Sequence, residues 1–225
     1  MMEQYDVIIP AWNAQSIILE TLHSIAAQTI KPHKIIVVDD GSTDETRAVV
    51  EASNLANVVI SIANQGPGAA TTRGFSEIES DYVAFCDADD IWLPHKSEQQ
   101  LHYLGANPLA DAVLCDTTPF RDVETGRQFG TPQETWGRTV LMMKRQAIGT
   151  IGDIIDPLGN RGDLVDWIAR GRELGIKFDY IREALAYRRI SSTSMSNGRN
   201  KQKDAGYLQV AHAALLRKRL RGEVV

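Results

Sequence analysis

The sequence predicts an α/β fold in which helices flank both faces of a mostly parallel β-sheet. Apolar, β-branched runs alternate with segments of helical spacing through the first half of the chain, an order that favours parallel strands joined by helices. One run, KIIVV at residues 34–38, is continuously apolar, as expected for a strand covered on both faces. The 225 residues suffice for one domain with a small appendage.

Five strands are expected in the first half, with a helix after each of the first four. After the first strand, Ile18, Leu22 and Ile25 recur at helical spacing, and Asn13 or Ser16 can cap that helix. The strands are expected at residues 5–10, 34–38, 58–62, 81–86 and 112–115.

Capping and turn residues indicate where the next three helices begin. Residues 42–45, with the sequence STDE, are typical of a capping box. The turn at Gly66, Pro67 and Gly68 leads into a helix that is expected to extend to Phe75. Pro94 suits the first turn of the fourth helix.

The second half of the chain is less regular. Residues 117–163 are rich in Gly, Thr, Arg and Pro, so irregular structure is expected there, with an antiparallel strand near residues 138–144. A helix is predicted over residues 163–174 and a short strand over 177–181. Residues 191–203 are polar and are expected to form a mobile loop before an amphipathic helix at 204–221.

Composition and charge exclude several classes of protein. A net charge of −5 argues against non-specific binding to nucleic acid. No apolar stretch approaches the ~20 residues that a membrane span needs, and the first residues lack the pattern of a signal peptide. Cys86 and Cys115 lie in apolar runs, which suits buried free thiols in a reducing compartment. A cytoplasmic protein is therefore expected.

The C-terminal end is basic although the whole chain is acidic. From Arg182 to Arg221 there are ten basic and two acidic residues. Two interpretations stay open. The basic end can bind a polyanion, a phosphate group or a membrane surface, or its cations can complement the dipole of their own helix. Peripheral contact with the inner membrane surface through this helix is thus one hypothesis.

Acidic residues follow two of the predicted strands. Asp39 and Asp40 end the second strand, and Asp87 and Asp89 end the fourth. Ligands of open α/β sheets bind beyond the carboxyl ends of the strands. Paired hard oxygen ligands there suit Mg²⁺ or Mn²⁺, although a capped turn is the structural alternative. A Rossmann dinucleotide site is disfavoured because residues 10–13 contain no glycine.

Four segments are more specific together than any of them alone. They are VIIPAWN at residues 7–13, VVDDGSTDET at 37–46, NQGPGAATTRG at 64–74 and FCDADDIWLP at 85–94. In this order they resemble the family 2 glycosyltransferases of the GT-A fold. The resemblance is dense over residues 5–105 and looser over 160–196. It implies an inverting transferase that uses a nucleotide-diphospho-sugar, foremost a UDP-sugar, with Mn²⁺ or Mg²⁺.

By position, the resemblance implies that the ends of the first two strands bind the nucleotide. Pro10, Ala11 and Asn13 would line the nucleotide pocket. Asp40 would accept a hydrogen bond from an N–H of the base ring, and Asp39 would steady the turn.

The same resemblance implies roles for three further residues. Arg73 would lie over the base or near the phosphates, and Asp87 would contact the ribose. Asp89 would ligate the metal ion that bridges the two phosphates. Such an ion stabilises the charge that builds up on the leaving diphosphate.

The acceptor side departs from the family pattern at the general base. Leu164 stands where a typical member has the aspartate that deprotonates the acceptor hydroxyl. Asp163 or Asp166 must then serve, and their spacing of three puts both on one helix face. Asp163 is preferred because a helix N-terminus stabilises its ionised form. The alternative is that Asp163 is only an N-cap.

A second departure concerns the metal site. Ser191 takes the position of a histidine that can complete the metal site in typical members. A hydroxyl is a weaker ligand than imidazole but still binds hard cations. Arg188 and Arg189, just before it, are candidates to pair with the diphosphate.

The expected organisation has two parts. Residues 1–196 are expected to form the GT-A domain, with 1–116 as the nucleotide-sugar half and 117–196 as the acceptor half. Residues 197–225 would form a mobile loop and the basic helix. The acceptor is left open between a glycan, a lipid-linked sugar, a small molecule and a peptide side chain. Trp92, Trp136 and Trp167 are candidates for stacking on a sugar, or else core residues.

Two other functions are weighed against the transferase. Leu164 and Ser191 both fall on the chemistry and not on donor binding, which motivates a nucleotide-sugar-binding protein that has lost catalysis. A nucleotidyltransferase would need a glycine- and lysine-rich phosphate loop, and residues 8–16 contain neither residue type.

Overall fold

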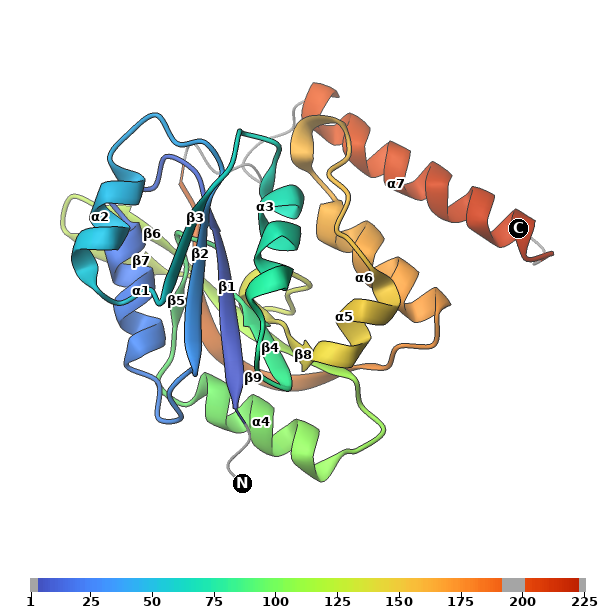
Figure 1. Cartoon of the computed structure of the whole chain (residues 1–225), viewed down its shortest axis with the longest axis horizontal. Coiled ribbons are helices and arrows are strands. Elements are labelled where there is room, and N and C mark those ends of the chain that lie inside the picture. Colours follow the sequence, from blue (N-terminus) through green and yellow to red (C-terminus); the bar gives the residue numbers. More distant parts are fainter. Residues whose placement is uncertain (1–3, 192–200, 223–225) are drawn as a thin grey trace.

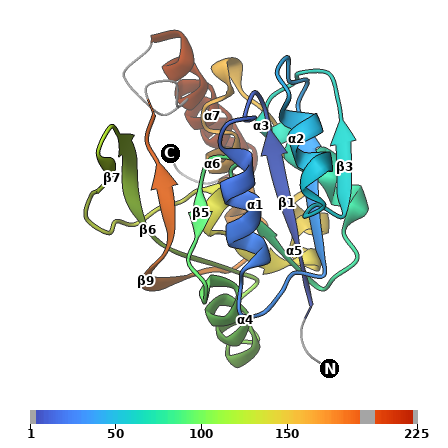
Figure 2. The same cartoon turned by 90° about the vertical axis from the view of Figure 1, so that its left-hand side faces the viewer.

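A computed structural model describes residues 4–191 and 201–222, with the side chains of residues 201–204 excepted. Its centre is a nine-stranded mixed sheet with the order β3-β2-β1-β4-β8-β6-β9-β5, and β7 pairs with β6 outside this path. The sheet separates two layers of helices: α1 and α2 lie on one side, and α3, α5 and α6 lie on the other (Figure 1, Figure 2). The α/β architecture with a mostly parallel first half confirms the predicted fold class.

The first half of the chain forms the parallel part of the sheet. Ile8 of β1 is in register with Ile36 of β2 and with Phe85 of β4, and all three are buried. The apolar run that predicted a doubly covered strand is therefore the centre of the core. The elements are β1 (Tyr5–Ala11), α1 (Ile18–Ala26), β2 (Lys34–Asp39), α2 (Thr46–Ser53), β3 (Val58–Ser61), α3 (Pro67–Gly74), the 3₁₀ turn η1 (Phe75–Glu77) and β4 (Tyr82–Phe85).

The second half adds antiparallel strands and the remaining helices. Strand β9 runs parallel to β6, whereas β8 runs antiparallel to both β4 and β6. The elements are β5 (Ile91–Trp92), α4 (Lys96–Ala106), β6 (Ala112–Val123), β7 (Gly126–Phe129), η2 (Arg138–Val140), β8 (Met142–Lys144), α5 (Arg145–Ile151), η3 (Leu158–Asn160), α6 (Asp163–Glu173), β9 (Phe178–Arg189) and α7 (Lys201–Leu220).

Residues 117–163 are more regular than predicted. They complete β6, form a hairpin with β7 and include the helix α5. The predicted antiparallel strand near residues 138–144 is present only as β8, after the 3₁₀ turn η2. The predicted loop at 191–203 lies largely outside the described residues. Cys86 and Cys115 are buried free thiols, as expected.

Two capping predictions were wrong in detail. Helix α1 begins after Ile17 without a side-chain cap. The STDE segment is not a capping box either, because Asp44 accepts the backbone N–H of Thr46 at 3.0 Å within a turn ahead of α2.

Candidate active site

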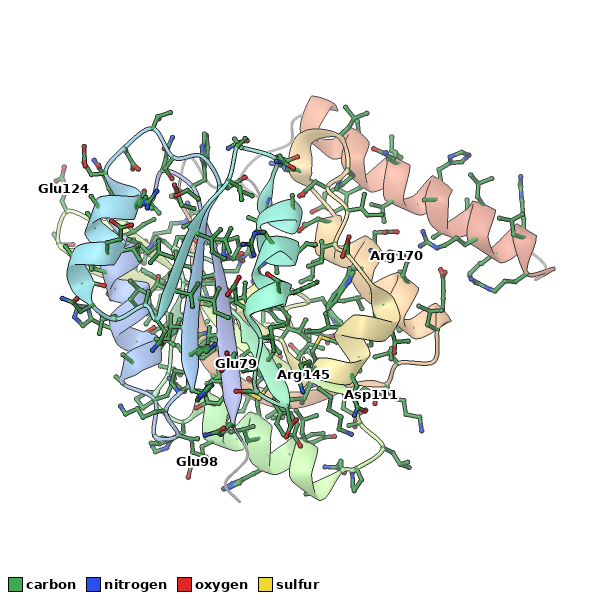
Figure 3. The ribbon with its side chains drawn as sticks, in the orientation of Figure 1. Glu79, Glu98, Asp111, Glu124, Arg145 and Arg170 are labelled. Atoms are coloured by element: carbon green, nitrogen blue, oxygen red, sulfur yellow. The ribbon has the colours of Figure 1, made fainter. Side chains whose placement is uncertain are left out.

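The carboxyl ends of β1 to β4 lie along one edge of the sheet, the upper edge in Figure 1. Because these four strands are parallel, every loop that follows one of them opens at this edge. The labelled side chains of Glu79, Glu98, Asp111 and Arg145 lie at the opposite edge (Figure 3). The polar residues singled out after the strand ends therefore gather on one side of the molecule.

The loops after β1 and β2 are joined by hydrogen bonds. The Asn13 backbone N–H donates to Ser42 Oγ at 2.9 Å, and Asn13 Oδ1 accepts the Thr43 N–H at 2.8 Å. Asn13 has a φ of 47°, a conformation that Asn tolerates better than most residues. Asp39 accepts the Ser42 N–H at 3.2 Å, so it holds the turn after β2. Pro10 and Ala11 form the last two buried positions of β1.

Asp40 holds the loop that leads into α3. Its two carboxylate oxygens accept the backbone N–H groups of Gln65 and Gly66 at 2.8 and 2.9 Å. Burial raises the pKa of Asp40, while these two hydrogen bonds oppose the rise. A carboxylate has about four lone-pair sites, so Asp40 retains acceptor capacity for a ligand.

Asp156, which sequence reasoning missed, covers the N-terminus of α3. Its oxygens accept the N–H groups of Gly68 and Ala69 at 2.9 and 2.6 Å. A Cβ added at Gly68 would lie 2.8 Å from Asp156 Oδ2, so glycine is required for this close approach. The contact ties the loop before η3 to the donor-side helix across 88 positions of sequence.

Three aspartates follow β4, and they differ in their surroundings. Asp90 is buried, accepts the Arg189 N–H at 2.8 Å and also accepts the hydroxyl of Thr139. Asp89 is partly buried, and its pKa is raised to about 6 by burial and by the neighbouring charge of Asp87. Asp90 is thus a structural anchor, while Asp89 carries a charge that the protein itself does not neutralise well.

The side chains available as metal ligands suit a divalent cation only in part. Among the described residues, no three His, Cys, Asp or Glu side chains cluster as a metal site. An ion such as Mg²⁺ typically takes one or two carboxylates and completes its shell with waters and substrate phosphates. Asp89, with the Asp87 charge beside it, fits that smaller role, because a cation would relieve the repulsion that raises the pKa of Asp89.

Arg138, also missed from the sequence, connects the loop after β4 to the start of α6. Its Nη1 lies 2.9 Å from Asp87 Oδ1, and its Nη2 donates to Asp163 Oδ2. The side chain is only 6% exposed. Asp87 lies in the loop after β4 and Asp163 begins α6, so one buried guanidinium holds two segments that are far apart in sequence.

The two candidate bases face different partners. Asp163 is the first residue of α6 and not its cap, which is Gly162, so the N-cap alternative is wrong. Asp166 instead pairs with Arg170 and with Arg217 of α7, both at 3.0 Å. Asp163 is therefore the candidate that lies beside the acids after β4.

The residues at the end of β9 serve the structure in different ways. The Arg189 guanidinium contacts Glu20 and Asp122 and donates to the backbone carbonyl of Asp89 at 2.9 Å. Since two carboxylates already bind it, Arg189 holds the loop after β4 in place and is a poor candidate to pair with the diphosphate. Arg188 and Ser191 lie beside it, at the last described positions before residue 192.

Arg73 is not brought to the strand ends. It lies in the last turn of α3, where its guanidinium contacts Ser76 at 2.5 Å and Glu77 at 3.2 Å. Its described partners therefore lie in η1, directly after α3, and not among the acids after β4.

Two of the three candidate tryptophans belong to the core. Trp167 is fully buried against Phe75 and Phe85, and its indole N–H donates to Gly152 O at 2.7 Å. Trp92 is buried as well. Of the two alternatives given for them, the core position is confirmed and stacking on a sugar is wrong. Trp136 is partly exposed and packs against Tyr180.

Trp12 is an exposed aromatic residue that sequence reasoning did not select. It directly follows β1 and is 58% exposed. A large apolar side chain with this exposure at a ligand-binding edge is a candidate to stack on a planar group. The signal in the sequence that could have identified Trp12 is its position directly after the first strand, next to Asn13.

The fold and the acids at its carboxyl edge define a glycosyltransferase of the GT-A type. The model of the family "Glycosyl transferase family 2" matches residues 6–220, and the chain belongs to this family. TuaG of Bacillus subtilis, named as a teichuronic acid biosynthesis glycosyltransferase, is 28% identical over 208 residues, which are 86% of this chain and 81% of TuaG.

A second relative matches a shorter segment. WfaP of Escherichia coli, named as a UDP-Glc:alpha-D-GlcNAc-diphosphoundecaprenol beta-1,3-glucosyltransferase, is 33% identical over 105 residues. These residues cover 46% of this chain and 42% of WfaP, so the match covers less than half of either protein.

Solved structures share the fold at lower identity. TarS of S. aureus in complex with UDP-GlcNAc superposes with a TM-score of 0.76 at 22% identity, over 95% of this chain and 66% of that one. The mannosyltransferase PcManGT of Pyrobaculum calidifontis, in complex with GDP-Man and Mn²⁺, gives 0.69 at 17% identity, over 98% and 76%. These likenesses establish the GT-A fold.

Proposed function

We propose that the chain transfers one sugar from a UDP-sugar to an acceptor hydroxyl with inversion at the sugar carbon. The observation that carries this proposal is the link through Arg138 between Asp87, at the end of β4, and Asp163, at the start of α6. An inverting transfer needs a leaving diphosphate and a base on opposite sides of one carbon. In this proposal Asp163 is the base, and the loop that contains Asp87 holds the donor whose diphosphate leaves.

The donor is held by the loops after β1 and β2 in this proposal. Asn13 and Asp40 are the polar groups at the nucleotide, Pro10 and Ala11 line the pocket, and Trp12 stacks on the base. UDP is favoured over other nucleotides because WfaP is named for UDP-Glc and TarS was solved with UDP-GlcNAc. PcManGT, solved with GDP-Man, makes GDP the alternative that a test must include.

A divalent ion, Mn²⁺ or Mg²⁺, is proposed at Asp89, with Asp87 beside it and Ser191 as a further oxygen donor. When bound, such an ion stabilises the charge that develops on the departing diphosphate. Asp87 also contacts the ribose in this proposal. Asp89 is suited to hold a cation because the negative charge of Asp87 acts on it, and a cation would offset the repulsion between the two carboxylates.

Asp163 is proposed as the general base. Its carboxylate accepts the proton of the acceptor hydroxyl while the oxygen forms a bond to the anomeric carbon and the bond to UDP breaks. Arg138 keeps the Asp163 side chain oriented towards the donor side. General-base help of this kind is worth about 10²–10⁴-fold in rate.

The acceptor proposed first is a sugar linked to a lipid. The name of WfaP includes a sugar linked to diphosphoundecaprenol. The basic C-terminal end of this chain favours binding to an anionic surface. Among the described residues no helix combines the length and the apolar character of a membrane span, so the proposed contact with the membrane is peripheral. The cytoplasm is the proposed compartment because Cys86 and Cys115 are free thiols.

A second candidate function is donor binding without catalysis. It is favoured by Leu164, which stands at the usual position of the base and is buried in α6. A buried leucine cannot accept a proton, so catalysis rests on Asp163 alone in the first proposal.

A donor panel with and without Mn²⁺ tests the transferase and the binding protein against each other. The wild type and Asp163→Asn are incubated with UDP-sugars and a lipid-linked acceptor, and released UDP and the anomeric configuration of the product are measured. Acceptor-dependent UDP release with an inverted product, lost in Asp163→Asn, supports the transferase. Donor binding with no release across the panel supports the binding protein.

A further inference from the structure

Helix α7 has one face that the protein covers and one that it leaves exposed. On the covered face, Val210 is buried and Gly206 approaches the loop at Arg161 so closely that a Cβ would lie 2.5 Å from its carbonyl oxygen. Arg217 pairs with Glu173 at 2.8 Å. These contacts fix which way the helix is turned on α6 and η3 (Figure 1).

The opposite side, which we call the outer face of α7, combines leucines with cations. Leu208 and Leu215 are 75% and 41% exposed, and their spacing of seven puts them on the same side of the helix, two turns apart. The outer face includes Leu208, His212, Leu215, Leu216, Lys218, Arg219 and Leu220.

The cations of the outer face are not used by the fold. Arg217 and Arg221 are bound to Glu173 of α6. Lys218 and Arg219 are exposed, and within the described part of the chain neither has an ion-pair partner. Two cations beside exposed leucines are the combination with which interfacial helices bind anionic bilayers.

We infer that the outer face of α7 docks on an anionic lipid bilayer. The leucines would enter the boundary between head groups and acyl chains, and the long stems of Lys218 and Arg219 would let their charges stay at the head groups. This inference deepens the proposed function by naming a surface that would bring the enzyme to a lipid-linked acceptor.

The charge distribution favours this orientation on the membrane. Residues 201–225 carry six basic and two acidic side chains, a net +4, which leaves −9 for residues 1–200. An anionic surface therefore repels most of the protein and attracts only its C-terminal end. The covered face of α7 keeps Arg217 in contact with α6, so docking needs no rearrangement of the fold.

The same charges disfavour a second copy of the chain on this face. In a parallel pair of α7 helices, Lys218 and Arg219 would lie beside their own copies. Like charges that face each other are unfavourable for such a helix pair.

Vesicle sedimentation of the full chain tests the inference. The vesicles contain phosphatidylcholine alone or phosphatidylcholine with phosphatidylglycerol. We expect binding to the anionic vesicles that weakens at high salt, and little binding to phosphatidylcholine alone. Absence of binding to the anionic vesicles would overturn the inference.

Matched variants separate the outer face from general surface effects. Leu208→Glu with Leu215→Glu is compared with Leu109→Glu with Leu174→Glu, whose leucines are 75% and 56% exposed elsewhere on the protein. Both pairs add the same negative charge. We expect at least tenfold weaker binding for the α7 pair, beyond the loss in the control pair. Equal losses in the two pairs would contradict docking through α7.

A second variant and a measurement of UDP affinity separate a loss of membrane docking from a loss of folding or of nucleotide binding. Lys218→Gln with Arg219→Gln leaves the leucines in place and should weaken binding by roughly fivefold for each cation. UDP affinity, measured without vesicles, should be unchanged in all variants. A protein that binds UDP but no vesicles would overturn only the docking. Self-association that Leu208→Glu abolishes would assign the face to a second copy instead.

Discussion

Arg138 of η2 and Asp163 of α6 form a buried ion pair. The same guanidinium contacts Asp87 at 2.9 Å, and the two pairs raise the pKa of Arg138 against the effect of its burial. Its Nε is buried without a hydrogen-bond partner among the described residues. The two carboxylates are therefore what keeps this cation in the interior.

Arg138→Met should destabilise the protein because two carboxylates would lose their shared cation. Breaking a buried ion pair costs about 3–5 kcal/mol in the free energy of unfolding, which urea unfolding can measure. Arg138→Lys should cost less, since it restores the charge but cannot bridge two carboxylates in the same planar geometry. A methionine variant as stable as the wild type would show that the two pairs contribute nothing net.

Asp163→Asn and Asp166→Asn should differ in their effect on the rate of transfer. The first removes the proposed base, so the rate of transfer should fall by about 10²–10⁴-fold while UDP affinity is retained. The second removes the contacts of Asp166 with Arg170 and Arg217, so it should lower the free energy of unfolding by about 1–3 kcal/mol with a small effect on rate. If Asp166→Asn were the slow enzyme and Asp163→Asn the fast one, the assignment of the base would be reversed.

The edge of the sheet could be predicted from the sequence because its signals are local. An apolar strand followed at once by acids or by Asn places those side chains at one edge in any parallel sheet. Asp39, Asp40, Asp87 and Asp89 all lie where this argument puts them. The fold class follows from the same alternation of strands and helices.

The features that the sequence did not predict depend on contacts between residues that are far apart along the chain. Arg138 meets Asp87 and Asp163 from 51 and 25 positions away, within a segment that carries no motif. Trp167 was left open between stacking on a sugar and the core, and the structure places it in the core. It follows Asp166 directly, but successive helical residues are about 100° apart, so the partners of the aspartate do not indicate the surroundings of the tryptophan.

The titration of Lys96 should make the free energy of unfolding rise with pH between about 8 and 10.5. This lysine is fully buried, and burial lowers its pKa from 10.5 to about 8. Between these two values the unfolded chain binds more protons than the folded one, so the free energy of unfolding increases as pH rises. Urea unfolding of the wild type and of Lys96→Met across this range measures the difference.

The comparison of Lys96→Met with the wild type controls for the other groups that titrate in this pH range. Lys96→Met removes the titration of Lys96, while Tyr5, whose pKa burial raises, contributes equally to both proteins. The stability of the wild type relative to the variant should therefore increase across the window. A constant difference would mean that Lys96 keeps its ordinary pKa in the folded protein.

Calorimetric titration with UDP, dTDP and GDP, each with and without Mn²⁺, tests the central claim most directly. The account predicts binding of UDP in preference to the other two, strengthened by Mn²⁺ in the wild type and no longer strengthened in Asp89→Ala. Such a result would support both the donor class and the metal position at the end of β4. Binding of none of the three nucleotides, or of GDP in preference to UDP, would contradict the proposed UDP-sugar transferase.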